Sequence, residues 1–225
     1  IDLAKIVKSN YTADIIVMTG QIRSYQYDEI ITIGASDFVE KPFSPREMIL
    51  RIDRVLRERG LRQIAKQAHE ELKISYIDSI HRLVMAAEYK DEDTGDHIVR
   101  IGQYCSLMAE KLSLSEEFIE TIYYAAPMHD IGKIGIPDKI LLKPGKLTHL
   151  EFETIKTHSQ IGARLLSRSK SKILQMAEEI ALSHHEKFNG KGYPNSIKGN
   201  KIPVSGRILS IADVFDALTS QRPYK

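Results

Sequence analysis

The chain has 225 residues, of which 42% are hydrophobic and 28% charged, so one or two folded domains are expected. Its net charge of +2 and its lack of dense lysine and arginine runs argue against nucleic-acid binding. A single cysteine excludes an internal disulfide, and no apolar run approaches the roughly 20 residues that span a bilayer. We expect a cytoplasmic protein that does not bind membranes. The first residues include charges and lack a methionine, so we expect the chain to begin inside a larger protein.

The first third alternates strand and helix patterns. Short β-branched runs at 14–20 (DIIVMTG) and 37–43 (DFVEKPF) predict buried strands, and a helix-like segment at 24–34 lies between them. Ser44, Pro45 and Glu47 then have the pattern of a helix start with a capping box. Strand, helix, strand and helix in succession predict a parallel α/β unit.

A long helical pattern follows, from Pro45 to about Lys90, and only Gly60 interrupts it. A loose apolar stripe among charged residues marks one side of this helix: Ile64, Leu72, Tyr76, Ile80 and Leu83. The stripe suits a signalling linker or a dimerising coiled coil, and the irregular heptads leave both interpretations open.

The remainder predicts helices joined by polar loops, and therefore an all-helical bundle. Capping boxes are expected at Ser113 with Glu116 and at Thr148 with Glu151. The predicted inward positions, helix by helix, are Ile98, Ile101, Cys105, Met108 and Leu112; Ile119, Ile122, Tyr123 and Ala126; Phe152, Ile155 and Leu165; Ile173, Met176, Ala177 and Ile180; and Ile208, Ile211, Phe215 and Leu218.

The eight histidines divide into two sets. Three have charged or polar neighbours and are predicted to be surface groups: His69, His81 and His149. Five fall on inward stripes of four helices: His97, His129, His158, His184 and His185. One buried histidine alone is usually a satisfied core residue. Five together favour a shared metal, because each unpaired buried polar group costs about 1–3 kcal/mol.

Carboxylates accompany these histidines. Asp130 directly follows His129, Asp213 lies on the last helix, and Asp93 precedes His97 by four residues. Histidines and carboxylates without cysteine suit iron, manganese or another catalytic divalent ion rather than structural zinc. More than four candidate ligands imply more than one ion, and two ions about 3.5–4 Å apart are a recurrent device for phosphoester hydrolysis.

Two further features adjoin the predicted metal ligands. Lys133 lies one turn past His129 and Asp130, where it would meet a bound phosphate oxygen or remain a solvated lysine, and Pro127 is expected to kink the preceding helix. The stretch SHHEKFNGKGYP at 183–194 is the second feature. Its glycines allow tight turns. Glu186 has two open interpretations, as a partner of an imidazole or as a solvated carboxylate. Tyr193 is expected either to line the pocket or to pack the loop. Ser183 is expected to have no specific role.

Three separated blocks resemble the HD-GYP domain, a branch of the HD metal-dependent phosphohydrolases: HDIGKIGIPDKIL at 129–141, HHEKFNGKGYP at 184–194 and IADVFDALTSQRPYK at 211–225. The first third resembles the second half of a response-regulator receiver domain, with Thr19 and Lys41 at matching positions. The resemblance implies a mainly α protein with three parts: a partial flavodoxin-like α/β receiver at 1–57, a helical linker at 58–79 and an HD-type bundle at 80–225.

The resemblance also implies roles for residues. Metal ligands would be Asp93, His97, His129, Asp130, His158, His184, His185 and Asp213. They would hold two or three divalent ions, iron or manganese, and the shorter Asp93 at a position where glutamate is expected leaves the third ion open. Lys133 and Asp130 would be catalytic. Arg222, Lys225, Tyr193 and Gly192 would contact the substrate.

The implied activity is hydrolysis of cyclic di-GMP to pGpG, GMP or both, by attack of a metal-activated hydroxide, in a two-component signalling protein. The alternatives are a catalytically weak or inactive cyclic-dinucleotide sensor, a phosphodiesterase for a hybrid cyclic GMP-AMP, and a purely structural bundle. Expected partners are cyclic di-GMP, a second copy through the linker helix, and a histidine kinase upstream of an intact receiver. The phosphoacceptor aspartate of a receiver belongs to a strand that this sequence does not contain.

Overall fold

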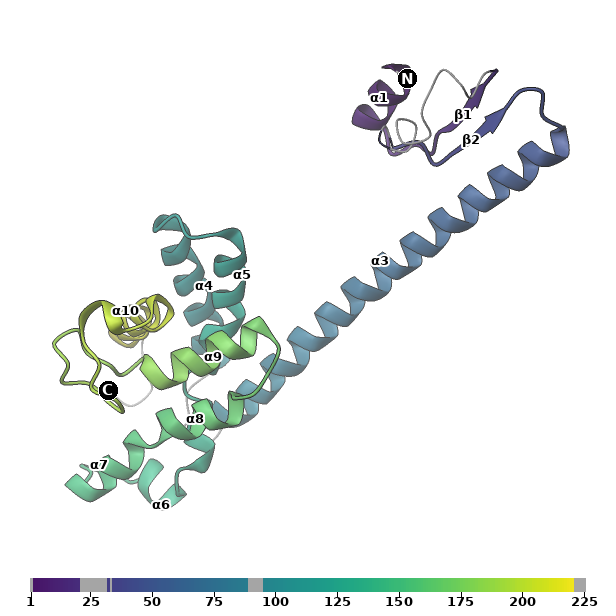
Figure 1. Ribbon diagram of the computed structural model, residues 1–225. Helices are drawn as coiled ribbons and strands as arrows, with labels where there is room; N and C mark the ends of the chain where they lie inside the picture. Colours follow the sequence, from purple (N-terminus) through teal and green to yellow (C-terminus); the bar gives the residue numbers. More distant parts are fainter. Residues whose placement is uncertain (1, 21–31, 33, 89–94, 221–225) are drawn as a thin grey trace. The chain divides into compact units, whose positions relative to one another are not determined.

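The computed structural model describes residues 2–20, 32, 34–88 and 95–220, and it forms two compact units, Ile1–Ile74 and Ser75–Lys225. In the first unit, α1 (Asp2–Asn10) precedes the strands β1 (Ile16–Thr19) and β2 (Asp37–Glu40), which lie side by side in Figure 1. The strands pair in parallel, with Ile16 opposite Asp37. Both predicted strands form, although β1 is only partly buried and its Met18 is 53% exposed. The helix expected at 24–34 falls almost entirely outside the described residues.

Helix α3 (Pro45–Glu88) begins as the sequence predicts and passes through Gly60 without a break. The hydroxyl of Ser44 accepts a hydrogen bond from the Glu47 amide at 3.1 Å, which is one half of the predicted capping box. The Glu47 carboxylate, expected to complete the box, pairs with Arg51 at 2.9 Å. Arg51 and Arg54 also reach the buried carboxylate of Asp37, at 3.3 and 2.7 Å. These two ion pairs tie the first turns of α3 to the start of β2.

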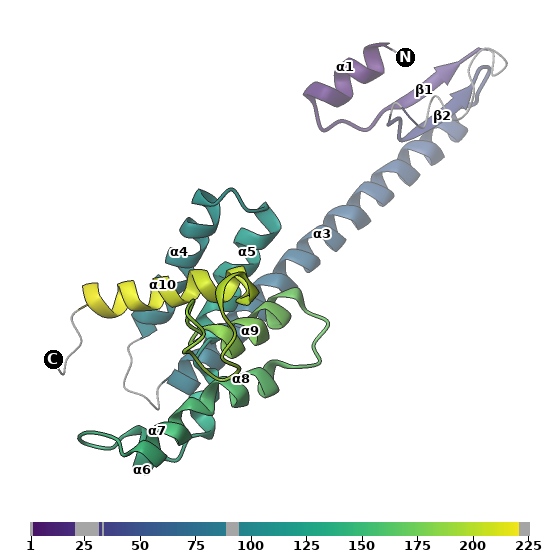
Figure 2. The same ribbon diagram turned by 60° about the vertical axis from the view of Figure 1, so that its left-hand side comes forward.

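The second unit is entirely helical in its described part (Figure 2). After the end of α3 come α4 (Gly95–Lys111), α5 (Glu116–Ala125), η3 (Ala126–Met128), η4 (Ile131–Gly135), α6 (Asp138–Leu141), α7 (His149–Lys156), α8 (His158–Leu166), α9 (Lys172–Ser183), η5 (Gly199–Lys201) and α10 (Val204–Thr219). Helix α9 packs against α5, α8 and α10, and α4 packs against α5 and α10. Among the described residues, no helix is long and apolar enough to cross a membrane.

The core of this unit confirms much of the predicted pattern. Buried as expected are Ile98, Ile101, Cys105, Ile122, Ala126, Ala177, Ile180 and Ile208. Other predicted core positions are exposed, and those expectations were wrong: Leu112, Tyr123, Phe152, Leu165, Ile211, Phe215 and Leu218. Helix α10 turns Leu209, Ala212 and Asp216 inward instead, so its buried face is displaced from the predicted one. Apolar periodicity marks two adjacent stripes on this helix, and only packing selects between them.

Two helix boundaries also differ from the prediction. The cap of α5 is Ser115, whose hydroxyl accepts from the Phe118 amide at 3.2 Å, whereas Ser113 has φ +55° just after α4. A left-handed residue after a helix ends that helix and does not start the next one. The capping box of Thr148 and Glu151 is confirmed, but its helix divides at Thr157 into α7 and α8. The periodicity that joined Phe152 to Leu165 therefore does not hold.

Candidate metal centre

The predicted His129–Asp130 pair lies in a tight turn. Helix α5 ends at Ala125, and the three-residue turn η3 with Pro127 in its middle replaces another α-helical turn, as the position of this proline predicts. His129 is buried and its Nδ1 lies 3.1 Å from the carbonyl oxygen of Ala126. Its Nε2 lies 3.3 Å from Asp130 Oδ2.

Two further histidines are oriented in the same manner. His158 places Nδ1 at 2.7 Å from the Ile155 carbonyl, and His184 places Nδ1 at 3.0 Å from the Ala181 carbonyl. A carbonyl oxygen only accepts hydrogen bonds, so Nδ1 carries the proton in each ring. In the neutral imidazole, Nε2 is then left with a lone pair, which is the form that binds metal.

The Nε2 atoms converge on Asp130. His158 Nε2 lies 3.2 Å and His184 Nε2 3.4 Å from Asp130 Oδ1, and the two nitrogens are 3.3 Å apart. Lone pairs at such separations repel unless a proton or a metal cation lies among them. Burial lowers the pKa of His184, and that of His185 to about 2, so a proton is disfavoured there. The donor set therefore fits a metal cation.

Asp130 remains an anionic ligand in this setting. Burial raises the pKa of its carboxyl, but the neighbouring His129 and Lys133 outweigh burial and hold this pKa well below its ordinary value. The Lys133 ammonium lies 2.8 Å from Asp130 Oδ2 and its side chain is only 16% exposed. The solvated alternative for Lys133 is thus wrong, and a cation stands directly beside the cluster.

The candidate ligands fall into two groups. In each group, one ligand atom from every member lies within 4.8 Å of the others. One group is Asp130, His158, His184 and His185, and the other is His97, His129 and Asp213. His97 comes from α4 and Asp213 from α10, and both face the turn that carries His129. Residues more than a hundred positions apart in the sequence are thereby brought together.

A buried carboxylate that the sequence pattern did not single out contacts His97. Asp216 Oδ2 lies 2.7 Å from His97 Nδ1, and Arg100 donates to both oxygens of Asp216, at 2.6 and 3.0 Å. Burial raises the pKa of Asp216, but the hydrogen bonds from Arg100 and His97 outweigh it and lower this pKa to about 2. The available signal was spacing, because Arg100 and Asp216 each follow a candidate ligand by three residues on the same helix.

The glycine-rich loop packs against the same cluster. The Tyr193 ring lies over His185, with centroids 4.6 Å apart and an interplanar angle of 32°. Burial raises the pKa of the Tyr193 phenol, which keeps it protonated. A Cβ at Gly192 would lie 2.3 Å from the Lys187 amide nitrogen, so only glycine allows this close approach.

Two other residues of this stretch have structural roles. Glu186 is 5% exposed and accepts from the Asn195 amide at 2.7 Å, so it holds the loop and its solvated alternative is wrong. Ser183 is also buried, and a Cβ at Gly206 of α10 would lie 2.1 Å from its hydroxyl oxygen. The prediction that Ser183 has no specific role was wrong, because it forms the close contact between α9 and α10.

Gly132 is a position that sequence reasoning missed. A Cβ there would lie 1.9 Å from the His158 carbonyl oxygen and 2.5 Å from the Gly162 amide nitrogen. The absence of a side chain lets η4 approach the start of α8, which brings Asp130 next to His158. Its place within HDIGK, three residues after His129, was the available signal.

Three predicted site residues lie outside the described residues: Asp93, Arg222 and Lys225. Their assigned roles stay predictions. The third metal ion, which depended on Asp93, stays a prediction as well.

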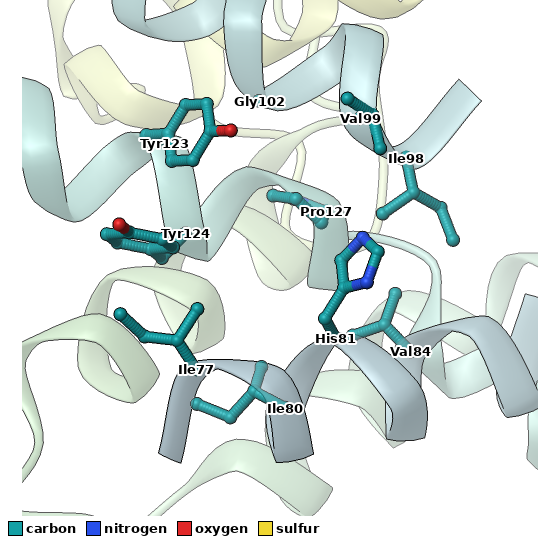
Figure 3. Close-up of a pocket in the computed structure, with 10 residues that line it drawn as sticks. All are labelled: Ile77, Ile80, His81, Val84, Ile98, Val99, Gly102, Tyr123, Tyr124 and Pro127. Carbon is teal, nitrogen blue, oxygen red and sulfur yellow. The ribbon is translucent and has the colours of Figure 1, made fainter. Parts of the chain in front are cut away.

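The second unit also has an apolar pocket whose lining includes none of the candidate ligands. It has a volume of about 130 Å³ between α3, α4 and α5, and Figure 3 shows its lining of Ile77, Ile80, His81, Val84, Ile98, Val99, Gly102, Tyr123, Tyr124 and Pro127. His81 is half-buried and lines this pocket together with Ile98 and Pro127, so the prediction of a surface group was wrong. His69 and His149 are exposed as predicted.

Residues 82–225 match the model of the HD domain, so the chain belongs to the HD domain family. It is 41% identical over 239 residues to a cyclic di-GMP phosphodiesterase of Thermotoga maritima, covering 98% of this chain and 65% of that protein. It is 43% identical to the cyclic di-GMP phosphodiesterase response regulator RpfG of Xanthomonas campestris, covering 85% of this chain and 54% of RpfG. It is 44% identical to the 3'3'-cGAMP-specific phosphodiesterase 2 of Vibrio cholerae, covering 69% of this chain and 30% of that enzyme.

The chain spans less than two thirds of the length of these relatives. The predicted helical HD-type fold is confirmed by the family match and by the helical second unit. The likeness of residues 1–57 to a receiver domain stays a prediction.

Proposed function

We propose that this chain carries a metal-dependent phosphodiesterase that hydrolyses cyclic di-GMP to pGpG, GMP or both. The observation that carries the proposal is the convergence of His158 and His184 Nε2 on one oxygen of Asp130, with the Lys133 ammonium on the other. Membership of the HD domain family and the names of the relatives support this assignment.

Two divalent ions, iron or manganese, suit the two groups of ligands. Their ligands would be Asp130, His158, His184 and His185 for one ion and His97, His129 and Asp213 for the other. When bound, such ions activate water and polarise a phosphoryl group. A third ion held with the help of Asp93 is a further part of the proposal.

The protein's own groups would bind and orient the substrate. Lys133 is held at 2.8 Å from Asp130, so its ammonium is fixed where it can donate to a phosphate oxygen at the cluster. Asp130 stays ionised and holds Lys133 in place. Tyr193, stacked on His185, lines the same side and offers an aromatic surface to the substrate. Arg222 and Lys225 are proposed to hold the other phosphate.

A second candidate substrate is 3'3'-cGAMP. The relative from Vibrio cholerae named for that substrate is 44% identical to this chain, close to the values for the cyclic di-GMP enzymes. Both dinucleotides carry the same phosphodiester backbone, so metal ligands and Lys133 do not distinguish them. Turnover assays run in parallel on cyclic di-GMP and 3'3'-cGAMP decide which dinucleotide is the substrate. Binding of either dinucleotide without turnover would favour a sensor.

The principal test replaces one ligand. Asp130→Asn keeps the side-chain size but removes the negative charge, so we expect loss of bound metal together with loss of cyclic di-GMP cleavage. Metal content and turnover are measured anaerobically on protein loaded with iron or manganese. Asp78→Asn is the control, because this exposed carboxylate forms an ion pair with Arg82 on α3. Full metal content and full turnover in Asp130→Asn would overturn the assignment.

The remaining parts of the proposal concern organisation. The protein would be cytoplasmic and would combine a partial receiver at 1–57, a linker at 58–79 and the hydrolase at 80–225, with a histidine kinase acting on the intact receiver. A homodimer through α3 is supported by exposed apolar residues on that helix, among them Leu61 and Leu72.

A further inference from the structure

Asp216 is a buried carboxylate with no role in the metal and substrate binding proposed so far. It lies on α10, one turn after the candidate ligand Asp213, and it is 1% exposed. A buried carboxylate requires partners, because removing its charge from water is costly. The hydrogen-bond partners of Asp216 therefore indicate its role.

The hydrogen bonds of Asp216 connect α10 to α4. Arg100 of α4 donates from Nε to Asp216 Oδ1 at 2.6 Å and from Nη2 to Oδ2 at 3.0 Å. This two-point contact fixes the plane of the carboxylate. Ser220 adds a hydrogen bond to Oδ1 at 3.2 Å, and Oδ2 faces His97 Nδ1 at 2.7 Å.

The position of His97 explains why it needs such a partner. His129, His158 and His184 each place Nδ1 against a backbone carbonyl three residues earlier. His97 lies in the first turn of α4, and its Nδ1 contacts the carboxylate of Asp216 instead. An ionised carboxylate only accepts, so Nδ1 carries the proton and Nε2 has the lone pair. That Nε2 lies 3.9 Å from Asp213 Oδ1, within the second ligand group.

We infer that Asp216, clamped by Arg100, is a positioning residue that sets the tautomer and orientation of His97 for the metal ion held with His129 and Asp213. This inference rests on the proposed function, since it needs a metal at the second ligand group. Partners of this kind on metal-binding histidines typically change metal affinity by 10–100-fold when they are removed. The effect is confined to one group, because Asp216 forms its hydrogen bonds with His97, Arg100 and Ser220, and within the described part of the chain none joins it to Asp130, His158 or His184.

Asp216→Asn is the informative change because it keeps the shape of the side chain. An amide has one oxygen and one NH₂ group, whereas both Asp216 oxygens accept. If the NH₂ group faces His97, the ring takes the tautomer with its proton on Nε2, which cannot bind metal. If the NH₂ group faces Arg100, two donors oppose each other and the clamp opens. Either orientation weakens the second group.

The experiment is a titration of the full metal-free chain with Mn²⁺ alone and, separately, with Co²⁺ alone, whose visible spectrum reports the ligands. We expect wild type to bind two ions, and Asp216→Asn to bind one with unchanged affinity and the other 10–100-fold more weakly. Arg100→Gln, which removes the clamp without touching His97, should give a smaller loss at the same site. Glu151→Gln breaks a remote ion pair with Lys143 and should change neither affinity.

Equal metal affinities in wild type, Asp216→Asn and Arg100→Gln would overturn the inference. Weaker binding of both ions together would also overturn it, since that indicates a general loss of structure. If Asp216→Asn does not fold, Arg100→Gln alone decides by the same criterion. Cyclic di-GMP turnover is measured in parallel. If Asp216→Asn selectively loses one ion but wild type cleaves no cyclic dinucleotide, the proposed function fails and the inference stands. If wild type cleaves cyclic di-GMP but the metal affinities of wild type and Asp216→Asn are equal, the inference fails and the proposed function stands.

Discussion

At the scale of single residues, the candidate metal centre depends on where its histidines stand relative to helix ends. His129 follows η3, His184 follows α9, and His158 begins α8 just after the end of α7. Each Nδ1 meets the carbonyl three residues before it. Carbonyls in the last turn of a helix lack a full set of intrahelical partners, so they are available to accept. The end of a helix therefore both places the imidazole and selects its tautomer.

A single glycine keeps two of these groups together, and its replacement is our first stability prediction. Gly132→Ala places a methyl group 1.9 Å from the His158 carbonyl oxygen, and backbone must move to accommodate it. We expect a loss of about 1–3 kcal/mol in the free energy of unfolding, as for other overpacked sites. Urea unfolding of the metal-free protein, followed by circular dichroism, measures this loss.

The control is Gly60→Ala in α3, where no atom lies within 4 Å of the new Cβ. Alanine favours an α-helix over glycine by about 0.5–1 kcal/mol, so this variant should be unchanged or more stable. A Gly132→Ala protein as stable as wild type would contradict the close approach between η4 and α8.

At the scale of helices and strands, the sequence predicted which segments form and misplaced several faces and ends. Both strands, the start of α3 at Ser44 and the capping box at Thr148 follow from local chemistry, so local patterns were sufficient for them. The division at Thr157 and the buried face of α10 depend on packing between distant helices. No local signal separates Leu209 from Ile211 as the inward residue.

Exposed leucines on α3 provide a surface for the proposed homodimer. Leu50, Leu61 and Leu72 follow one another at intervals of eleven residues and are 59%, 66% and 69% exposed. Residues at this interval lie on one side of an α-helix, and an 11-residue apolar repeat is typical of helices that pair in a right-handed supercoil. We therefore expect the two-site variant Leu61→Arg, Leu72→Arg to lose self-association.

Sedimentation velocity over a range of protein concentrations measures that loss. Gln63→Arg with Gln67→Arg is the matched control, since it adds the same charge at exposed positions on other sides of α3. Wild type that sediments as a monomer at every concentration, or equal dimerisation in the leucine variant, would show that α3 is not the interface.

At the scale of the whole molecule, the candidate site is an outcome of packing in the second unit. The sequence pattern identified the five histidines as inward and Asp130 and Asp213 as their accompanying carboxylates, and the resemblance implied that all of them bind metal. Neither the pattern nor the resemblance predicted that His129 groups with His97 while Asp130 groups with His158. That division depends on how α4, α8, α9 and α10 pack together. Asp216 was overlooked for the same reason, since its partners lie more than a hundred residues away.

Neutral imidazoles packed into this unit should make the metal-free protein sensitive to acid. Burial lowers the pKa of His184 below its ordinary 6.5, and lowers that of His185 to about 2. In the unfolded chain both rings take up a proton as the pH falls through about 6.5. Below that pH the unfolded state binds more protons than the folded state, so the free energy of unfolding must fall as the pH falls.

The window of this effect is set by the same shifts. It begins near pH 6.5 and continues toward the folded pKa of about 2 for His185. Asp216 has a pKa lowered from 3.8 to about 2, so the stability it contributes is present above about 4 and is lost only below that pH. Urea unfolding of the metal-free protein at pH 7.5, 6 and 5 therefore reports the histidines and not this carboxylate.

His185→Gln should show a shallower decline than wild type between pH 6.5 and 5, because one imidazole no longer gains a proton on unfolding. His149→Gln is the control and should keep the wild-type slope, since the His149 side chain is 86% exposed and meets nearly the same solvent in both states. A free energy of unfolding that stays constant from pH 7.5 to 5, or an identical slope in His185→Gln, would mean that these imidazoles are not held neutral by burial. The arrangement of lone pairs around Asp130 would then need a proton rather than a metal ion.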